Sequence, residues 1–193
     1  MNVNEKLRLG HVRRWHIVAV SREQTVADHS HRVGVITEEI LRILGIFNWN
    51  SNTTLNAMRW AAIHDRPEIK LGDIPTPGKE LIRSNSARGR DPIHLSELEA
   101  EATDLEYFEL SECVSPGGDC SVAGHVVKLA DTLEAINYLG IFGVGSHAHE
   151  VWRGLTFQAL RQIETLNTQY QLPKSTRGRM AELYNRLLEK NAQ

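Results

Sequence analysis

Apolar residues at helical spacing recur along this chain, and no stretch alternates between apolar and polar residues as a strand would. Thr25 is followed three residues later by Asp28, a spacing typical of a helix-starting capping box with Asp in place of Glu. Gly45 then supplies the residue type that commonly ends a helix. Between these signals, one face of the predicted helix carries His29, Val33, Ile36, Ile40 and Ile43.

Further helical segments are predicted along the chain, separated by turns. Three prolines, Pro67, Pro75 and Pro77, interrupt the helical pattern, and the polar stretch 84–91 is interpreted as a loop. The chain has 193 residues, 41% of them hydrophobic, which suits one compact core. We predict an all-α fold, a single helical bundle over residues 1–193. Its other helices are expected from Thr53 or Thr54 to the His64-Asp65 pair, from Leu95 to Leu110, from Ser121 to about Gly140, from about His149 to Tyr170 and from Thr176 to Lys190.

The overall charge excludes one class of partner. A net charge of −2 and a pI of about 6.5 argue against the broad basic surface that duplex nucleic acid requires. Small anionic substrates need only a local cluster of Arg and Lys. The sequence has no apolar run of membrane-spanning length and no signal-peptide pattern, so we expect no membrane association and a cytoplasmic location.

Two cysteines, Cys113 and Cys120, flank a Pro- and Gly-containing turn. A disulfide is conceivable there, and reduced thiols are favoured in a cytoplasmic protein. Their spacing does not fit a structural zinc knuckle. Trp49, Trp60 and Trp152 are expected to be packing residues.

Three polar features need an explanation in a helical core. His29 leads an apolar stripe, so its ring points inward, either as a hydrogen-bonded core histidine or as a metal ligand. The pair His64-Asp65 ends an apolar helical segment, where the two side chains converge only if the chain turns. Asp131 lies on a helix that is apolar over most of its girth, where an uncompensated charge is costly.

One divalent cation would account for all three features. Imidazole and carboxylate ligands together suit zinc, manganese, iron or cobalt, and do not suit calcium. We therefore predict a mononuclear site, with Zn²⁺ favoured and Co²⁺, Mn²⁺ or Mg²⁺ as alternatives. Its predicted ligands are His29, His64, Asp65 and Asp131. His147 and His149 are only two residues apart, so on a helix their rings diverge and no metal pair is expected.

This set of residues resembles the H…HD…D pattern of the HD-domain phosphohydrolase superfamily. The resemblance is closest to the 5′-deoxynucleotidases of the YfbR type and covers about the first two-thirds of the chain. It extends over Arg14-Trp15, Asp28-His29-Ser30, the run 64–79 and Lys128-Leu-Ala-Asp131. It implies an HD-domain fold, a divalent metal and a homo-oligomer, either a dimer or a hexamer. The apolar and aromatic stretch 138–142 is the sequence's own support for an oligomer.

Within that subgroup, Arg14-Trp15-His16-Ile17 is similar to the phage dATP triphosphohydrolases. In those enzymes the Trp and the Ile two residues later shape the adenine pocket, whereas bacterial nucleotidases typically place Pro after the Arg-Trp pair. The resemblance implies that Trp15 offers a stacking surface and that Ile17 forms a wall against a purine 2-amino group. Such a wall rejects guanine and 2-aminoadenine. A plain core position is the competing interpretation of Trp15.

The resemblance also implies the reaction. Water attacks the α-phosphorus, and the 5′-oxygen of the nucleoside leaves. Glu68 is placed to orient or deprotonate that water, or to protonate the leaving oxygen. Asp73 could share the proton work or contact the sugar. Taken alone, Glu68 is equally compatible with a surface residue, and Asp73 with a turn cap.

Phosphate groups require cations, and Arg14, Lys79 and Lys128 are the predicted contacts because each adjoins a predicted site element. Lys128 precedes Asp131 by three residues, so the two share a helix face. Three more arginines follow Lys79 and could reach a triphosphate tail, with exposed loop positions as the competing interpretation: Arg83, Arg88 and Arg90.

The favoured function is therefore a metal-dependent phosphohydrolase that converts dATP, and also dADP and dAMP, to deoxyadenosine and the intact phosphate chain. Its expected partner is a small-molecule deoxynucleotide, and its effect is to deplete the dATP pool. One alternative is a broad 5′-deoxynucleotidase limited to monophosphates. A second is a non-catalytic nucleotide-binding HD regulatory protein, which could keep the metal ligands and lose Glu68.

Overall fold

The computed structural model describes residues 1–87, 95–118 and 121–189. Within these ranges the secondary structure is helical apart from two isolated β-bridges, which confirms the all-α prediction. The elements are α1 (Val3–Lys6), the 3₁₀ helix η1 (Leu7–His11), α2 (Val26–Leu44), α3 (Asn52–Ile63), α4 (Glu68–Leu71), α5 (Thr76–Ala87), α6 (Leu95–Glu101), α7 (Leu105–Val114), α8 (Ser121–Phe142), α9 (Gly145–Gln169) and α10 (Lys174–Leu188). No helix of the described ranges is both long and apolar enough to cross a membrane.

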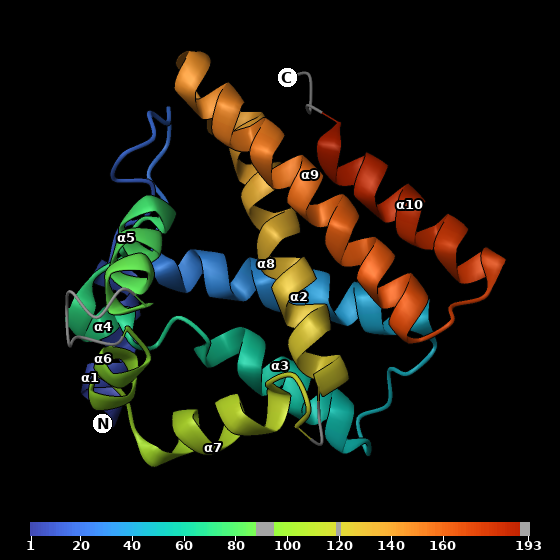
Figure 1. The fold of residues 1–193 in the computed structure, drawn as a ribbon, viewed down its shortest axis with the longest axis horizontal. Coiled ribbons are helices and arrows are strands. Elements are labelled where there is room, and N and C mark those ends of the chain that lie inside the picture. The colour runs from blue at the N-terminus through green and yellow to red at the C-terminus, as the bar shows by residue number, and fades with distance from the viewer. Residues whose placement is uncertain (88–94, 119–120, 190–193) are drawn as a thin grey trace.

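Helix α8 is the centre of the fold and packs against α2, α3, α9 and α10. Figure 1 shows α8 crossing α2, with α9 and α10 side by side along one flank and α3 and α7 along the other. The short helices α4, α5 and α6 gather with α1 beside the start of α2. The buried core is built mainly from α2, α3 and α8.

Helix α2 begins and ends where the sequence predicts. The Thr25 side chain accepts a hydrogen bond from the backbone N–H of Asp28, and Gly45 adopts the left-handed conformation (φ 73°) that closes the helix. The predicted stripe from His29 to Ile43 is buried throughout. His29 therefore lies in the core, at the end of α2 that faces the turn after α3.

Helix α8 is buried on nearly all sides, from Ala123 to Leu139. An isolated amphipathic helix would leave one face in water, whereas this one is surrounded by helices. It therefore carries its acidic residues, Asp131 and Glu134, into the protein interior, where side-chain exposure is 20% and 2%.

Residues 12–25 form a loop that leaves η1 and folds back to the start of α2. Arg13 pairs with Thr25 at one end, and Val20 pairs with Gly143 near the tip. The tip is further tied to the α8–α9 junction because Ser21 N–H donates to the Phe142 carbonyl at 2.8 Å and Val144 N–H donates to the Ala19 carbonyl at 2.9 Å. Tyr138 also donates its hydroxyl proton to the Arg22 carbonyl. The segment is thus fixed to α8 at several points.

Four details differ from the sequence predictions. The expected helix Leu95–Leu110 is split into α6 and α7, because the Asp104 side chain accepts from the Tyr107 N–H and starts a new helix. The stretch 84–91 was predicted as a loop, but α5 continues through Ala87, since a polar composition is compatible with an exposed helix face. Arg88, Arg90 and Cys120 lie outside the described residues, as does the side chain of Arg83.

The remaining two differences concern exposure. In the stretch 138–142, Tyr138 and Leu139 are buried against the segment 12–25 and α9, and Ile141 is the exposed member. The support that this stretch gave for an oligomer is correspondingly weaker. Trp49 is 61% exposed, with its ring at a steep angle to that of Phe47, so it is not a core packing residue. Trp60 and Trp152 pack against the core as predicted.

Candidate active site

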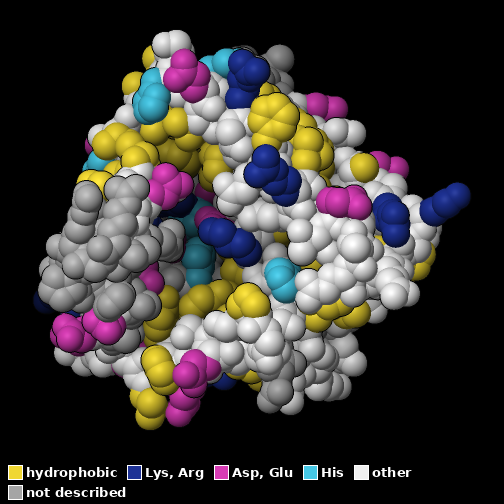
Figure 2. Space-filling view, viewed as in Figure 1, with side chains coloured by type: hydrophobic (Ala, Val, Ile, Leu, Met, Phe, Trp, Pro, Cys, Tyr) yellow, Lys and Arg dark blue, Asp and Glu magenta, His cyan; other side chains and the backbone are white. Residues whose placement is uncertain are grey.

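The four predicted metal ligands come together from three helices. His29 projects from α2, His64 and Asp65 follow the last residue of α3, and Asp131 projects from α8. His29 Nε2 lies 3.4 Å from Asp65 Oδ2 and 3.3 Å from Asp131 Oδ1. His64 Nε2 lies 3.5 Å from Asp65 Oδ2, and ligand atoms of His29, His64 and Asp131 all lie within 4.8 Å of one another. A hollow opens in the face shown in Figure 2, with histidine, acidic and basic side chains in and around it.

The chemistry of these donors fits one divalent ion. The Nε2 atoms of His29 and His64 are buried and have no hydrogen-bond partner among the described residues. Their Nδ1 atoms are occupied, by Glu134 Oε2 at 2.7 Å and by the Ala61 carbonyl at 3.0 Å respectively. A proton held on Nδ1 leaves the Nε2 lone pair available, which is the arrangement of metal-binding histidines. Two nitrogen and two carboxylate donors match zinc and related ions.

The charges of these side chains act strongly on one another's pKa values. Burial raises the pKa of Asp131, but Lys128 and His29 bring it well below its ordinary value. Burial and Arg14 lower the pKa of His29, but Asp131, Glu134 and Asp65 outweigh them and raise it to about 9. A proton on His29 thus supplies the positive charge that the carboxylates require.

Glu68 lies beside the ligands, as the sequence predicts. It begins α4, is 6% exposed, and its Oε2 has no hydrogen-bond partner among the described residues. Its Oε1 lies 3.5 Å from Lys79 Nζ. Burial and the charges of Asp65 and Asp73 raise the pKa of Glu68 to about 8, against the opposing charges of Lys79 and Arg14. The carboxyl group can therefore hold a proton near neutral pH.

A cavity of about 20 Å³ adjoins this carboxyl group. It is lined by residues of the α3–α4 turn and α5, including His64, Asp65, Glu68 and Lys79. That volume admits one water-sized molecule. Asp73 lies on the segment between α4 and α5, close enough for its charge to act on both Glu68 and Arg14.

Arg14 approaches the site from the segment 12–25. Its side chain is 15% exposed, and its Nη1 lies 3.7 Å from Glu134 Oε2 without a hydrogen bond to any described residue. Burial lowers the pKa of Arg14, but Asp65, Asp131, Glu134 and Asp73 together raise it above its ordinary value. The structure therefore brings Arg14 to the carboxylates of the predicted metal site.

Trp15 occupies a strained position on the same segment. Its φ is 68°, a left-handed conformation that costs a bulky residue about 1–3 kcal/mol. Its ring stacks on Tyr138, with centroids 5.9 Å apart, and the Arg14 guanidinium lies 5.3 Å from the ring centroid. Its Nε1–H donates to Gln24 Oε1 at 2.8 Å. Trp15 is thus partly a packing residue, and its place beside Arg14 keeps it next to the site.

Ile17 and His16 lie on the turn that follows Trp15. Val18 N–H donates to the Trp15 carbonyl at 3.1 Å, which closes the turn. Ile17 is 52% exposed and His16 is exposed. An aliphatic side chain in this position is available to contact a ligand held beside Trp15.

Lys128 lies on the opposite side of the site, toward the start of α8. Its Nζ lies 2.8 Å from Asp131 Oδ2, and its side chain is 62% exposed. A groove of about 430 Å³ begins beside it, between α3, α7 and α8. Tyr107 and Phe108 line one wall of this groove, and His125 lines the other together with Lys128. Lys128 therefore connects the predicted metal ligand Asp131 with this groove.

Two residues that the sequence analysis did not select belong to this site. Glu134 accepts from His29, and Gln24 Nε2–H donates to Glu134 Oε1 at 2.7 Å. Glu134 could have been found, because it is a second acidic residue one turn after Asp131 on the same apolar helix. Gln24 gave no such signal, since its role depends on a contact with a residue far away in the chain.

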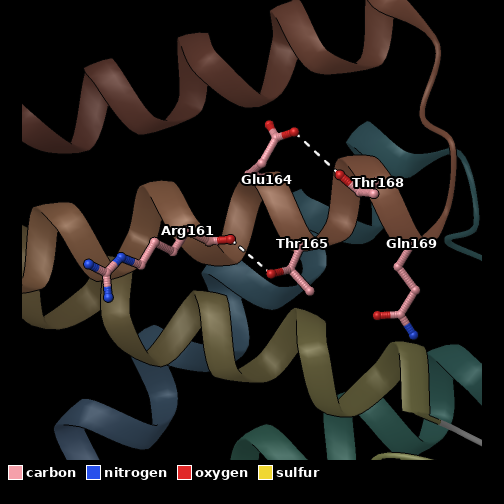
Figure 3. A pocket seen from close by; sticks show the side chains of 5 residues that line it. All are labelled: Arg161, Glu164, Thr165, Thr168 and Gln169. Carbon is pink, nitrogen blue, oxygen red and sulfur yellow. Dashed lines mark hydrogen bonds between the residues drawn. The ribbon is translucent and has the colours of Figure 1, made fainter.

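Other polar clusters lie apart from these side chains. His147 and His149 are both exposed, on either side of buried Ala148, as expected for rings that diverge. Asn56 Nδ2–H donates to Cys113 Sγ at 3.7 Å. A hollow of about 520 Å³ is lined by Arg161, Glu164, Thr165, Thr168 and Gln169, all from α9 (Figure 3). Thr165 and Thr168 bond back to α9 itself, so nothing there resembles a catalytic centre.

Comparison with known proteins places these features in a family. The family model described as 5′-deoxynucleotidase YfbR-like matches residues 5–139. A dATP triphosphohydrolase of Cyanophage S-2L is 31% identical over 159 residues, which cover 82% of this chain and 81% of the relative. A dATP triphosphohydrolase of Salmonella phage PMBT28 is 33% identical over 159 residues, which cover 80% of this chain and 74% of the relative.

A solved structure agrees over the whole length. The Cyanophage S-2L HD phosphohydrolase (DatZ), bound to dA and one catalytic Zn²⁺ ion, superposes with a TM-score of 0.77 at 28% identity. The match covers 97% of this chain and 96% of that chain. It therefore includes α9 and α10, which lie beyond the range of the family model.

Proposed function

Since this chain belongs to the YfbR-like 5′-deoxynucleotidase family of HD-domain phosphohydrolases, we propose that it is a metal-dependent hydrolase of dATP. The observation that carries the proposal is the convergence of His29, His64, Asp65 and Asp131, with both Nε2 atoms turned toward the carboxylates. The phage relatives named dATP triphosphohydrolases support the choice of substrate. The zinc ion in the DatZ structure supports the choice of metal.

The proposed reaction breaks the bond between the α-phosphorus and the 5′-oxygen. Water adds to the phosphorus, the 5′-oxygen leaves and takes a proton, and the products are deoxyadenosine and triphosphate. A divalent ion held by the four ligands would polarise a phosphate oxygen and increase the acidity of water. Shorter phosphate chains, in dADP and dAMP, present the same bond.

Glu68 is the proposed proton-transfer residue. Its buried carboxyl group has one oxygen near Lys79 and another without a described partner, beside a cavity of about 20 Å³ that can admit a water. From this position it can orient the attacking water and accept its proton, or deliver a proton to the 5′-oxygen. Asp73, whose charge acts on Glu68, is proposed to assist this transfer or to contact the sugar.

The proposed base pocket lies at the Trp15 end of the site. Trp15 is held in a left-handed conformation against Tyr138, and Ile17 projects from the turn that follows with half of its surface exposed. Ile17 would stand against the purine edge, where an adenine presents only hydrogen and a guanine presents an amino group. A 2-amino group would then clash or stay unpaired, which is an effective means of rejection.

The proposed phosphate path runs from the metal ligands along α8. Arg14 and Lys79 flank the ligands, and Lys128 stands at the start of the groove of about 430 Å³. Room and positive charge beyond the α-phosphate favour a triphosphate over a substrate limited to one phosphate. This groove is the specific feature that separates the proposal from the alternative of a monophosphate-only 5′-deoxynucleotidase.

Product analysis with a panel of substrates tests the proposal. The panel contains the four dNTPs, the four dNMPs and 2-aminoadenine deoxynucleotides, each assayed with Zn²⁺, Co²⁺, Mn²⁺ and Mg²⁺. We expect triphosphate and deoxyadenosine from dATP, and no turnover of the 2-amino analogue. Asp65→Ala is the control for adventitious hydrolysis and should lose both bound metal and activity. Turnover of monophosphates alone, or of all bases equally, would contradict the proposal.

We also propose that the protein acts on small deoxynucleotides as a homo-oligomer, a dimer or a hexamer, and not on duplex nucleic acid. The exposed apolar residues of α9, Phe157 and Leu160, are compatible with an interface between copies. Light scattering at working concentration tests the assembly, and a monomer would rule it out.

A further inference from the structure

A continuous chain of hydrogen bonds connects the base end of the site to a metal ligand. Trp15 Nε1–H donates to Gln24 Oε1 at 2.8 Å, and Gln24 Nε2–H donates to Glu134 Oε1 at 2.7 Å. Glu134 Oε2 then lies 2.7 Å from His29 Nδ1. These hydrogen bonds run from the segment 12–25 to α8 and then to α2, so they join parts of the protein that are distant in sequence.

The direction of every link is fixed by chemistry. An indole nitrogen can only donate, and a carboxylate can only accept. The Gln24 amide must therefore turn its oxygen to Trp15 and its nitrogen to Glu134, and Glu134 must receive the proton on His29 Nδ1. The chain admits one arrangement of its donors and acceptors, and in that arrangement His29 Nε2 is free to bind a cation.

The three inner residues of this hydrogen-bond chain are buried, so a broken link between them cannot be replaced by a hydrogen bond to water. Gln24, His29 and Glu134 are each 1% exposed or less. Groups withdrawn from water in this way have no alternative partner when one link fails, so a mismatch cannot be relieved by solvent.

We propose that Glu134 and Gln24 are positioning residues, which hold the His29 imidazole in its metal-binding orientation and couple it to Trp15. Neither touches the reacting atoms. They join the adenine end and the metal end of the site in a single hydrogen-bonded unit. Removal of the Trp15 indole N–H should therefore change the affinity of the site for its metal. This inference rests on the proposed metal-dependent function, but its test measures metal affinity and does not require turnover.

The test is a swap of the two polar side chains. Glu134→Gln places an amide nitrogen against the Gln24 amide nitrogen, and any flip transfers the mismatch to Trp15 or His29. Gln24→Glu sets two carboxylates against each other. The double variant Gln24→Glu/Glu134→Gln restores every link, because Glu at position 24 accepts from Trp15 and from Gln at position 134, whose oxygen accepts from His29.

Zn²⁺ affinity is measured for the four proteins by competition with a chromophoric chelator, and far-UV circular dichroism checks folding. We expect each single variant to bind Zn²⁺ about ten- to a hundredfold more weakly, and the double variant to recover most of the loss. A merely structural role does not predict recovery. Single variants that bind like the parent, or a double variant whose loss is the sum of the two single losses, would overturn the proposal.

Trp15→Phe tests the first hydrogen bond of this series, between Trp15 and Gln24. It also provides an independent test if a swap variant does not fold. It keeps an aromatic ring on Tyr138 and removes the N–H that Gln24 accepts. We expect weaker Zn²⁺ binding, by about threefold or more if one net hydrogen bond is coupled to the metal. Trp152→Phe is the matched control, since its Nε1 is buried without a described hydrogen-bond partner. Equal Zn²⁺ affinity in Trp15→Phe and the parent would refute the coupling.

Discussion

Lys79 Nζ lies 3.5 Å from Glu68 Oε1, so an ammonium group on α5 faces a buried carboxyl group at the start of α4. Asp65 and Asp73 act on the same carboxyl group with the opposite sign. Burial and these two anions therefore favour the protonated form of Glu68, and two cations, Lys79 and Arg14, favour its ionised form. This balance is suited to a residue that has to accept and release a proton during a reaction.

Replacing Glu68 by Gln should separate metal binding from catalysis. The amide keeps the shape of the side chain but cannot transfer a proton, and Glu68 is not one of the proposed metal ligands. We expect normal metal content and a rate on dATP reduced by about a hundred- to ten-thousandfold. Glu80→Gln, at an exposed position on α5, is the control. Full activity in Glu68→Gln would remove Glu68 from the mechanism.

Lys79→Met and Asp73→Asn should shift the pH dependence in opposite directions. Lys79 lowers the pKa of Glu68 and Asp73 raises it, around a value of about 8 in the metal-free protein. Loss of Lys79 should therefore move the Glu68 limb of the pH–rate profile to higher pH, and loss of Asp73 should move it to lower pH. The readout is the position of the limb in kcat/KM, measured after normalising each profile to its own maximum.

Lys70→Met supplies the control for these two variants, because the Lys70 ammonium group lies on the outer side of α4, near the Glu101 carbonyl. Its profile should coincide with that of the parent. Shifts of the same sign in Lys79→Met and Asp73→Asn would show that Glu68 does not govern the limb.

The sequence pointed to the proposed metal ligands because each stands in a locally improbable setting. His29 stood in an apolar stripe and Asp131 on a nearly apolar helix, and burial of either without a partner would be costly. The same reasoning extends to Glu134, one turn after Asp131. It does not extend to Gln24, whose selection requires knowledge that the segment 12–25 packs against α8.

Helix boundaries were less predictable where competing local signals were present. Asp104 interrupts an otherwise continuous acidic helix because its side chain caps the Tyr107 N–H, in a segment where Glu residues alone favour helix. Tyr138 looked exposed because it lies near the end of α8. It is buried because the segment 12–25 folds back over it, with Trp15 stacked on its ring.

The affinity for zinc should fall as the pH is lowered. Burial and Arg14 lower the pKa of His29, but the carboxylates of Asp131, Glu134 and Asp65 outweigh them and raise it to about 9. Below that pH the ring is protonated, and a metal ion has to displace the proton. We expect the affinity to drop about tenfold per pH unit between pH 8 and 6 from this proton alone.

Chelator competition at several pH values, corrected for protonation of the chelator, measures this dependence. Burial lowers the pKa of His64, so His64 should add less to this dependence than an ordinary histidine would. An affinity that is constant from pH 8 to 6 would contradict the assignment of His29 as a ligand.

A second charged cluster should control stability in acid. Hydrogen bonds from Arg66, Arg59 and Lys6 lower the pKa of Glu106 to about 2. Because this folded-state pKa lies below the ordinary value of 4.5, the stabilisation is complete above pH 4.5 and is lost as the pH falls toward 2. Glu106→Gln should therefore lower the free energy of unfolding at pH 7, by about 1 kcal/mol for a partly exposed group.

Urea denaturation at pH 7 and at pH 3 checks this expectation. The difference between Glu106→Gln and the parent should shrink at the lower pH, because Glu106 is protonated in the unfolded chain below its ordinary pKa of 4.5. Glu112→Gln, an exposed position on α7, is the control. A difference that grows in acid would place the origin of the effect elsewhere.

Ile17→Ala should relax the selectivity for adenine. Ile17 is 52% exposed on the turn closed by the Val18–Trp15 hydrogen bond, and the proposed base pocket places it against the purine edge. Removing three carbon atoms makes room for a 2-amino group without altering the metal ligands or Glu68. We expect hydrolysis of dGTP to rise about tenfold, the lower end of what small apolar differences achieve, while kcat on dATP stays within a few-fold of the parent.

The measurement is kcat/KM for dATP and dGTP in parallel, with Val35→Ala, a similarly exposed aliphatic position on α2 (58%), as the matched control. The control should keep the parent's ratio of the two rates. Metal content should be the same in all three proteins, so that a change in ratio reflects the pocket. If Ile17→Ala loses dATP turnover without gaining dGTP turnover, Ile17 supports the Trp15 turn and does not form the wall. The selectivity would then have to come from contacts that Trp15 makes with the base itself.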